Sequence, residues 1–226
     1  IKSARGIGYP HALNLPIDET KIPSFVKPYL ELTQKMAFLI AQMDKSAIES
    51  IKIEAEGEIS DYLDSLETFA IVGSLTHSLS NEKINYVNAT FVANERGIKV
   101  DSSVHTNTSA YKNQVTVKIT TSHGVNTTSG TIFEEEVQRI IKINDFLMDI
   151  EPSGKMILLT NSDVPGVIGS VGSILSDENI NIADFRLGRS KDGALAVIVV
   201  DEDVSNKTLE KLQNLEAAKS VSYAQI

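Results

Sequence analysis

The stretch NSDVPGVIGSVGSILSDENINI, residues 161–182, fixes the local fold of the C-terminal third of the chain. Its Pro-Gly pair closes a turn, and the apolar spacing that follows predicts a helix over 166–175 with a strand directly after it. Helix-start N–H groups can hold a carboxylate, while Asn and Asp side chains can hold an ammonium group. The stretch therefore predicts a polar pocket for a small amino acid, with an ordinary capped helix as the alternative.

The elements around this helix follow one another in a clear order. Apolar runs predict strands over 156–160, 180–187, 194–200 and 221–226, with a second helix over 208–215. The order β-α-β-β-α-β, with right-handed crossovers, gives a four-stranded antiparallel sheet with both helices on one face, which is the ferredoxin-like plan. Such a sheet leaves an open face and edge strands, so we expect it to pair with a second copy.

The N-terminal part begins with a stretch interrupted by glycine and proline, after which apolar residues recur at regular spacing. Glycines and prolines break any regular pattern over residues 1–23, which we interpret as an extended connector. Residues 24–45 have apolar side chains at helical spacing and predict one amphipathic helix, with Ser24 as its N-cap. Pro28 is compatible with this helix because it lies in the first turns.

Residues 46–151 predict a mixed α/β domain. The alternation from Ile51 to Ile59 indicates a strand, residues 61–79 indicate a helix, and a short helix stopping at Gly97 leads into another strand. Two hairpins follow, the first turning at residues 122–124 and the second at 144–145. The sequence EPSG at 151–154 then predicts a boundary before a domain at 155–226.

Composition limits the class of protein. The 226 residues are 42% hydrophobic and 23% charged, and no apolar run approaches the roughly 20 residues that span a bilayer. We therefore expect a soluble, cytoplasmic protein. The formal charge of −9 argues against a nucleic-acid surface, and the absence of cysteine excludes disulfides and thiolate zinc sites. The first residue is Ile1, so we expect a piece of a longer chain.

The segments DVPGVIGSVGSIL and NINIADFRLGR, within residues 155–226, resemble the ACT domain, a regulatory module of amino-acid pathway enzymes. The upstream segments ALNLP at 12–16, VNATFVANERGI at 87–98 and SGTIFEEEVQRIIKIN at 129–144 resemble the intervening domain of the D-3-phosphoglycerate dehydrogenase family. Family members usually have glycine where Glu134 follows the GTIF segment. The resemblance covers nearly the whole chain.

The resemblance implies a mixed α/β intervening domain followed by a ferredoxin-like ACT domain. It implies the regulatory and oligomerisation part of an NAD-dependent dehydrogenase at the first step of L-serine biosynthesis, with L-serine as feedback effector and a homodimer or homotetramer as the assembly. Two alternatives stay open: an oligomerisation module without a ligand, and the regulatory part of an L-serine dehydratase. The ALNLP connector favours the dehydrogenase.

The family pattern also implies site residues. The effector site would comprise Asn161, Asp163, the helix start Gly166, Val167 and Ile168, and Asn181. Asp163 and Asn181 match the family positions whose side chains contact L-serine across a domain dimer, and Asn161 matches a position where a further polar contact is often found. The alternative reading makes Asp163 a helix cap and Asn181 a turn residue. In the intervening domain, Arg96, Lys118 and Arg139 are candidates for an anion site, with surface ion pairs as the alternative.

The sequence predicts no catalytic residue, no metal and no NAD site within this chain. Gly166, Gly169 and Gly172 have the spacing G-x-x-G-x-x-G, which is not the dinucleotide fingerprint, and we interpret them as a stripe for close helix packing. The four histidines have no ligand spacing, and no motif groups Ser, His and Asp into a triad. A third hypothesis, that the chain is a catalytic fragment, is therefore disfavoured.

Overall fold

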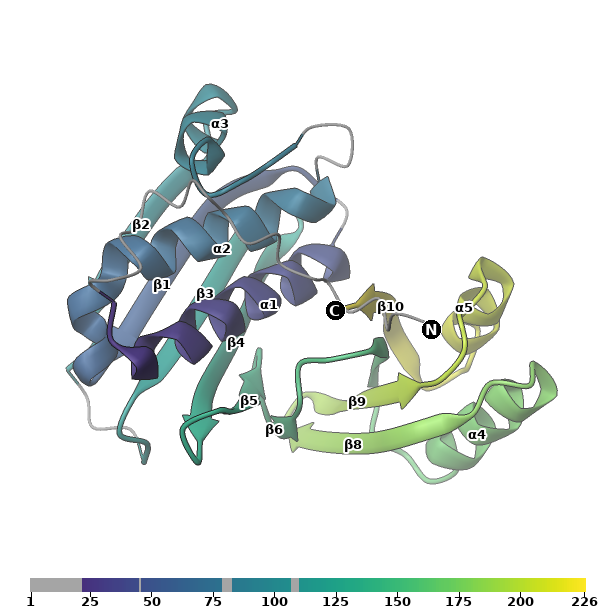
Figure 1. Ribbon diagram of the computed structural model, residues 1–226. Helices are drawn as coiled ribbons and strands as arrows, with labels where there is room; N and C mark the ends of the chain where they lie inside the picture. The colour runs from purple at the N-terminus through teal and green to yellow at the C-terminus, as the bar shows by residue number, and fades with distance from the viewer. Residues whose placement is uncertain (1–21, 45, 79–82, 107–109) are drawn as a thin grey trace, which may run out of the picture.

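The computed structural model describes residues 22–44, 46–78, 83–106 and 110–226. The expected connector at 1–23 and its ALNLP segment lie almost wholly outside the described residues. The described chain forms two sheets, each with its own helices (Figure 1). The elements of the first part are η1 (Ser24–Val26), α1 (Lys27–Met43), β1 (Ile48–Glu56), η2 (Glu58–Tyr62), α2 (Leu63–Ser78), α3 (Ala89–Glu95), β2 (Lys99–Val104), β3 (Gln114–Thr121), β4 (Gly124–Phe133), β5 (Val137–Ile143) and β6 (Phe146–Ile150).

The first sheet has six strands in the order β2-β1-β3-β4-β5-β6. β1 and β2 run parallel and the other neighbours run antiparallel, so both predicted hairpins, β3–β4 and β5–β6, are confirmed. α1 and α2 lie side by side across one face of this sheet (Figure 1). They pack closely at Gly73, where an added Cβ would lie 2.2 Å from the carbonyl oxygen of Gln34.

Two local predictions in this part are corrected. Ser24 is not the N-cap of the long helix: it opens a short 3₁₀ turn, and α1 begins at Lys27 with Pro28 in its first turn. The strand that begins before Ile51 ends at Glu56, because Gly57 has a φ of 83° and redirects the chain. Ile59 is fully buried from the 3₁₀ turn η2 rather than from a strand, so the period of two continues only by coincidence.

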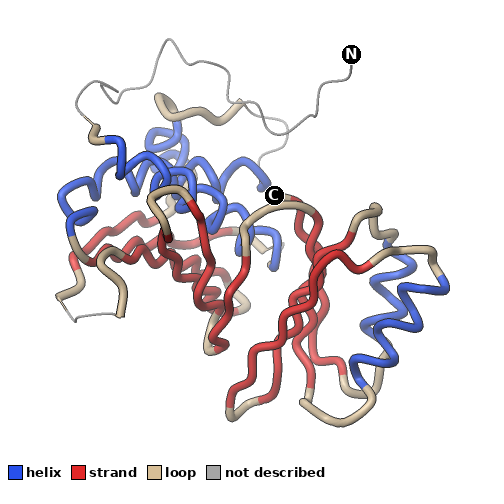
Figure 2. Tube along the Cα trace, turned by 60° about the horizontal axis from the view of Figure 1, so that its bottom comes forward, coloured by secondary structure: helices blue, strands red, loops and turns tan. Residues whose placement is uncertain are grey.

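The second sheet has four antiparallel strands in the order β10-β7-β9-β8. Its elements are β7 (Lys155–Asn161), α4 (Val167–Asp177), β8 (Ile182–Ser190), β9 (Gly193–Val200), α5 (Asn206–Gln213) and β10 (Ala218–Gln225). Both helices lie on one face, the one turned away from the six-stranded sheet (Figure 2). The predicted ferredoxin-like plan is therefore confirmed, with boundaries shifted by up to three residues.

The prediction of an open face on this sheet is wrong. The apolar side chains opposite α4 and α5 belong to the same buried cluster as α1 and the first sheet; they are Met156, Leu158, Leu195, Val197 and Ala224. β10 lies against α1, and β8 lies against β6. At Gly188 an added Cβ would lie 2.8 Å from the carbonyl oxygen of Leu147 in β6. Both faces are thus buried within one chain, because alternate residues of these strands are apolar on each side.

The turn between β4 and β5 contains Glu134, at the position where the family resemblance led us to expect glycine. Glu134 and Glu135 have φ values of 48° and 70°, in the left-handed region that glycine favours. The turn still closes a regular hairpin, in which Phe133 pairs with Val137. A glutamate at position 134 is therefore compatible with this loop at the cost of backbone strain.

Candidate functional site

The turn between β7 and α4, residues 162–166, is exposed. Asp163 has a φ of 52° and Gly166 a φ of 94°, both in the left-handed region, and the helix starts at Val167. No side chain caps this helix. Its first N–H groups are therefore available to a ligand or solvent, which is the condition for binding an anion at a helix start. The cap role considered for Asp163 is wrong.

Asn161 holds this turn in place through a side-chain hydrogen bond to its backbone. Its side chain is 2% exposed, and its Oδ1 accepts a hydrogen bond of 2.8 Å from the backbone N–H of Asp163. Its Nδ2 is buried and has no hydrogen-bond partner among the described residues. A buried amide donor without a partner costs free energy, so this donor is suited to an acceptor brought by a ligand or by water.

A pocket of about 260 Å³ lies where the turn, α4 and the second sheet meet. Its floor is apolar, from Leu159, Val171 and Ala196, and Asn161 and Asp163 contribute polar side chains to its lining. Five of the six predicted effector-site residues line it: Asn161, Asp163, Gly166, Val167 and Ile168. A volume of this size suits a small molecule of a few heavy atoms rather than a dinucleotide.

A second hollow, of about 440 Å³, lies on the other side of the same turn. It shares residues 164–167 with the first and adds Ser162, Ser170 and Glu216 among others. The turn is therefore reached from both sides, and residues 162–166 are all exposed.

Arg189 also lines the pocket, although it is not among the predicted site residues. Its Nε lies 3.2 Å from Oδ1 of Asp163, and the two side chains are 69% and 34% exposed. Arg189 stands on β8 with Phe185 and Leu187, which also line the pocket, at a spacing of two residues. That alternation within the segment NINIADFRLGR was the signal that could have identified it.

The sixth predicted residue, Asn181, is not in this pocket. It follows the opposite end of α4, where its Nδ2 donates a hydrogen bond of 2.6 Å to Asp201 and its backbone N–H donates one of 2.7 Å to Glu202. A single copy of the chain therefore does not bring Asn181 to the predicted site. Its contribution would require the α4 end of a second copy.

The three candidate anion-binding residues of the first part are not gathered in one place. Lys118 pairs with Glu54 at 2.9 Å in the middle of the six-stranded sheet. Burial alone would raise the pKa of Glu54, but hydrogen bonds from Lys118 and Lys52 outweigh it and place this pKa below its ordinary value. Arg139 pairs with Asp149 at 3.3 Å and with Glu151 at 3.4 Å on the far strands. Arg96 follows α3, away from both.

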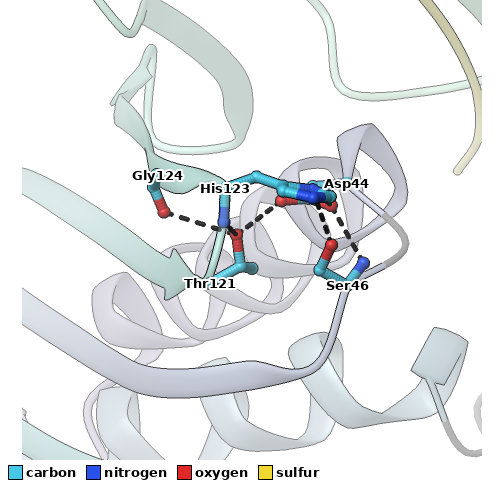
Figure 3. Close-up of polar contacts among 5 residues, drawn as sticks. All are labelled: Asp44, Ser46, Thr121, His123 and Gly124. Carbon is cyan, nitrogen blue, oxygen red and sulfur yellow. Dashed lines mark hydrogen bonds and ion pairs between the residues drawn. The ribbon is translucent and has the colours of Figure 1, made fainter.

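A separate polar cluster joins the end of α1 to the β3–β4 hairpin (Figure 3). The carboxylate of Asp44 accepts hydrogen bonds from Thr121 Oγ1 and from the backbone N–H of Ser46, and His123 lies beside it. The hydrogen bond from Thr121, followed by those from Ser46 and His123, lowers the pKa of Asp44 to about 2 against the opposing effect of burial. The cluster therefore holds a charged carboxylate.

This cluster contains Ser, His and Asp but not the geometry of a catalytic triad. Ser46 Oγ lies 2.7 Å and Asp44 Oδ1 3.4 Å from the same ring nitrogen, Nδ1 of His123. A proton relay needs the serine and the carboxylate on opposite ring nitrogens. The arrangement ties three segments together and has no activated nucleophile.

The glycine stripe on α4 does not serve helix packing within the chain. A Cβ added at Gly166, Gly169 or Gly172 would meet nothing within 4 Å. The described part of the chain also contains no group of three or more His, Cys, Asp or Glu residues able to hold a metal, and none of its helices is long and apolar enough to cross a membrane.

Two family models match this chain, one for each sheet. The D-3-phosphoglycerate dehydrogenase intervening domain matches residues 25–144, and the ACT domain matches residues 155–217. The chain is 31% identical over 223 residues to the D-3-phosphoglycerate dehydrogenase of Bacillus subtilis, covering 98% of this chain and 42% of that protein. It is 30% identical over 230 residues to the enzyme of the same name from Archaeoglobus fulgidus, covering 100% and 44%.

A third relative, the D-3-phosphoglycerate dehydrogenase of Synechocystis, is 28% identical over 89% of this chain and 37% of its own length. The chain thus spans less than half the length of the relatives it matches. The matches to the Bacillus subtilis and Archaeoglobus fulgidus enzymes cover 98% and 100% of this chain and therefore include both sheets described above.

Proposed function

Because the chain belongs to the D-3-phosphoglycerate dehydrogenase family, whose intervening domain it contains together with an ACT domain, we propose that it is the regulatory and oligomerisation part of such an enzyme. The whole protein would oxidise 3-phosphoglycerate with NAD at the start of L-serine biosynthesis. Gly166, Gly169 and Gly172 do not fit NAD, since only Gly166 lies in the turn before α4 while Gly169 and Gly172 lie on the helix itself. We therefore assign NAD and hydride transfer to other parts of the whole protein.

L-serine is the effector that we propose for the pocket beside α4. The observation that carries this proposal is the buried Asn161, whose Nδ2 lacks a partner among the described residues while its Oδ1 holds the backbone of Asp163. Together with the carboxylate of Asp163 and the uncapped start of α4, it offers acceptors for an ammonium group and donors for a carboxylate. The pocket volume of about 260 Å³ suits an amino acid with a small side chain.

A second copy of the chain completes the site in this proposal. Val164 and Ile168 beside the pocket are 48% and 54% exposed, and Leu187 is 36% exposed. Exposed apolar side chains around a pocket that also contains polar groups are typical of a surface that another subunit covers. In such a dimer Asn181 of one copy would reach the pocket of the other, which accounts for its distance from the pocket within one chain.

Regulation would follow from the packing of the second sheet against the first part of the chain. Its inner face shares a buried cluster with α1, and Gly188 of β8 contacts β6 directly. A ligand that binds one arrangement of two ACT domains more tightly than another would therefore shift the intervening domains with them. The size of the effect is limited by the difference in affinity between the two arrangements.

Arg139 remains the residue that we propose for an anion site in the intervening domain. Its partners Asp149 and Glu151 are 70% and 69% exposed, so their ion pairs are weak and can be exchanged for a phosphate or carboxylate ligand. Lys118 is a poorer candidate because Glu54, which is 16% exposed, holds it. Ligand-free oligomerisation and the regulatory part of an L-serine dehydratase stay as alternatives.

Calorimetric titration of the chain with L-serine, using D-serine and glycine as controls, tests the main proposal. We expect saturable binding that prefers L-serine, and a loss of at least about tenfold in affinity in Asp163→Asn and Asn181→Ala. Asp184→Asn is the matched control, because Asp184 also pairs with an arginine Nε on the same strand but does not line the pocket.

Sedimentation measured with and without L-serine separates the alternatives. A dimer that forms equally well in both conditions, together with no heat on titration, would favour the ligand-free oligomerisation module. Binding of L-serine by this chain, accompanied by serine inhibition of the whole protein's oxidation of 3-phosphoglycerate, would distinguish the dehydrogenase from the dehydratase.

A further inference from the structure

Arg189 has no role in the function described so far, although it lines the pocket that we assign to L-serine. Asp163 and Arg189 are the two charged residues among those that line this pocket, one negative and one positive. A pocket with one charge of each sign matches an amino-acid zwitterion, which carries both charges on neighbouring atoms. A free amine or a carboxylic acid would leave one of the two protein charges without a partner.

The geometry leaves most of the guanidinium free for a ligand. Arg189 contacts Asp163 through Nε at 3.2 Å, and no other side-chain hydrogen bond or ion pair of Arg189 is found within the described ranges. An arginine has five N–H donors in a planar fork, so the two terminal nitrogens can still bind a carboxylate with two parallel hydrogen bonds.

The ion pair between Asp163 and Arg189 is also easy to rearrange. Its two side chains are 34% and 69% exposed, and exposed ion pairs contribute little to stability. The backbone of Asp163 is held by the hydrogen bond from its N–H to the buried Asn161. Arg189 can therefore move by rotation about its side-chain bonds while the backbone that carries Asp163 stays in place.

We propose that Arg189 is a specificity-determining residue of the pocket: its guanidinium binds the α-carboxylate of the ligand while Asp163 binds the α-ammonium group. This inference rests on the proposed function, since it concerns the same pocket. The pair present in the ligand-free chain is exchanged for two ion pairs with the ligand. The pocket then binds α-amino acids more tightly than the corresponding amines, amides and hydroxy acids.

The competing view makes Arg189 an ordinary surface residue that shields Asp163. The two views predict different changes in L-serine affinity for the variant Arg189→Gln. If Arg189 only competes with the ligand for Asp163, Arg189→Gln should tighten L-serine binding or leave it unchanged. If Arg189 binds the carboxylate, the same variant should weaken L-serine binding by at least about tenfold, with Arg189→Lys between the two because it keeps the charge and loses the fork.

Calorimetric titration with L-serine measures this change in affinity. It compares the unmodified chain with Arg189→Gln, Arg189→Lys and the control Arg186→Gln. Arg186 lies on the same strand and pairs through Nε with Asp184 at 2.8 Å, but it does not line the pocket. Its removal changes the net charge equally and is expected to change the affinity by less than about twofold. Tighter or unchanged binding in Arg189→Gln would overturn the inference.

L-serinamide separates direct binding from mere positioning of Asp163, because it keeps the ammonium group and lacks the carboxylate. We expect Arg189→Gln to change L-serinamide affinity by less than about twofold while it weakens L-serine. An equal loss for both ligands would mean that Arg189 acts only through Asp163, and the inference would fail while the serine site stood. Absence of L-serine binding to the unmodified chain would overturn the proposed function and this inference together.

Discussion

Asp44 is the residue whose charge is most clearly tied to the fold. It ends α1, and its carboxylate accepts hydrogen bonds from Thr121 of β3 and from the backbone of Ser46 just before β1 (Figure 3). Its pKa is lowered from the model-compound value of 3.8 to about 2, chiefly by the hydrogen bond from Thr121. The folded state therefore stabilises the ionised carboxylate of Asp44 more than the unfolded chain does.

This shift predicts a pH dependence of stability. A lowered carboxyl pKa contributes stability that is fully present above pH 3.8 and is lost as the pH falls through about 2. We expect Asp44→Asn to lower the free energy of unfolding by about 1–2 kcal/mol near neutral pH, and the difference from the unmodified chain to shrink towards pH 2. Urea unfolding at several pH values measures this.

Asp145→Asn is the control for that experiment, since it removes the same charge in the exposed turn between β5 and β6. It should leave the free energy of unfolding within about 0.5 kcal/mol at every pH. A difference between Asp44→Asn and the unmodified chain that stays constant down to pH 2 would show that the charge of Asp44 is not what joins these segments.

At the scale of elements, the crossing of α1 and α2 depends on Gly73. An added Cβ there would lie 2.2 Å from the carbonyl oxygen of Gln34 and 3.0 Å from the Cβ of Ala37. Backbone cannot yield as a flexible side chain can, so Gly73→Ala must push the helices apart. We expect a loss of about 1–3 kcal/mol in the free energy of unfolding.

Gly172→Ala is the matched control on α4, where an added Cβ meets nothing within 4 Å. There the better helix propensity of alanine should leave stability unchanged or raise it by up to about 1 kcal/mol. Thermal unfolding of Gly73→Ala and Gly172→Ala measures the change in stability that each substitution causes. Equal destabilisation by the two substitutions would contradict the assignment of close helix packing to Gly73 rather than to the α4 stripe.

At the scale of the whole molecule, the two sheets share one buried cluster through the inner face of the second sheet. This continuity predicts a single cooperative unfolding transition by calorimetry, although two family models divide the chain. Gly188→Val should split it, because an added Cβ would lie 2.8 Å from the carbonyl of Leu147 and 3.0 Å from the Cβ of Phe146. Two transitions in the unmodified chain would show that the shared cluster contributes little.

The candidate site was partly predictable because much of it is local. Asn161, Asp163 and the start of α4 are close in sequence, and the Pro-Gly turn alone places them around one pocket. Arg189 comes from a separate strand, and only the pairing of β8 with β9 brings it opposite Asp163. Asn181 was included by family pattern, but it lies at the other end of a helix of 11 residues.

The sequence by itself determined the order and type of nearly every element, since hydrophobic periods and turn residues act over a few neighbouring positions. It also determined the ferredoxin-like plan of the second sheet, because handedness leaves few topologies for β-α-β-β-α-β. Only the tertiary structure decided that both faces of this sheet are buried, and that Asp44 meets Thr121 and Asp163 meets Arg189. These contacts join residues far apart in the chain, and their formation depends on packing over the whole molecule rather than on local preference.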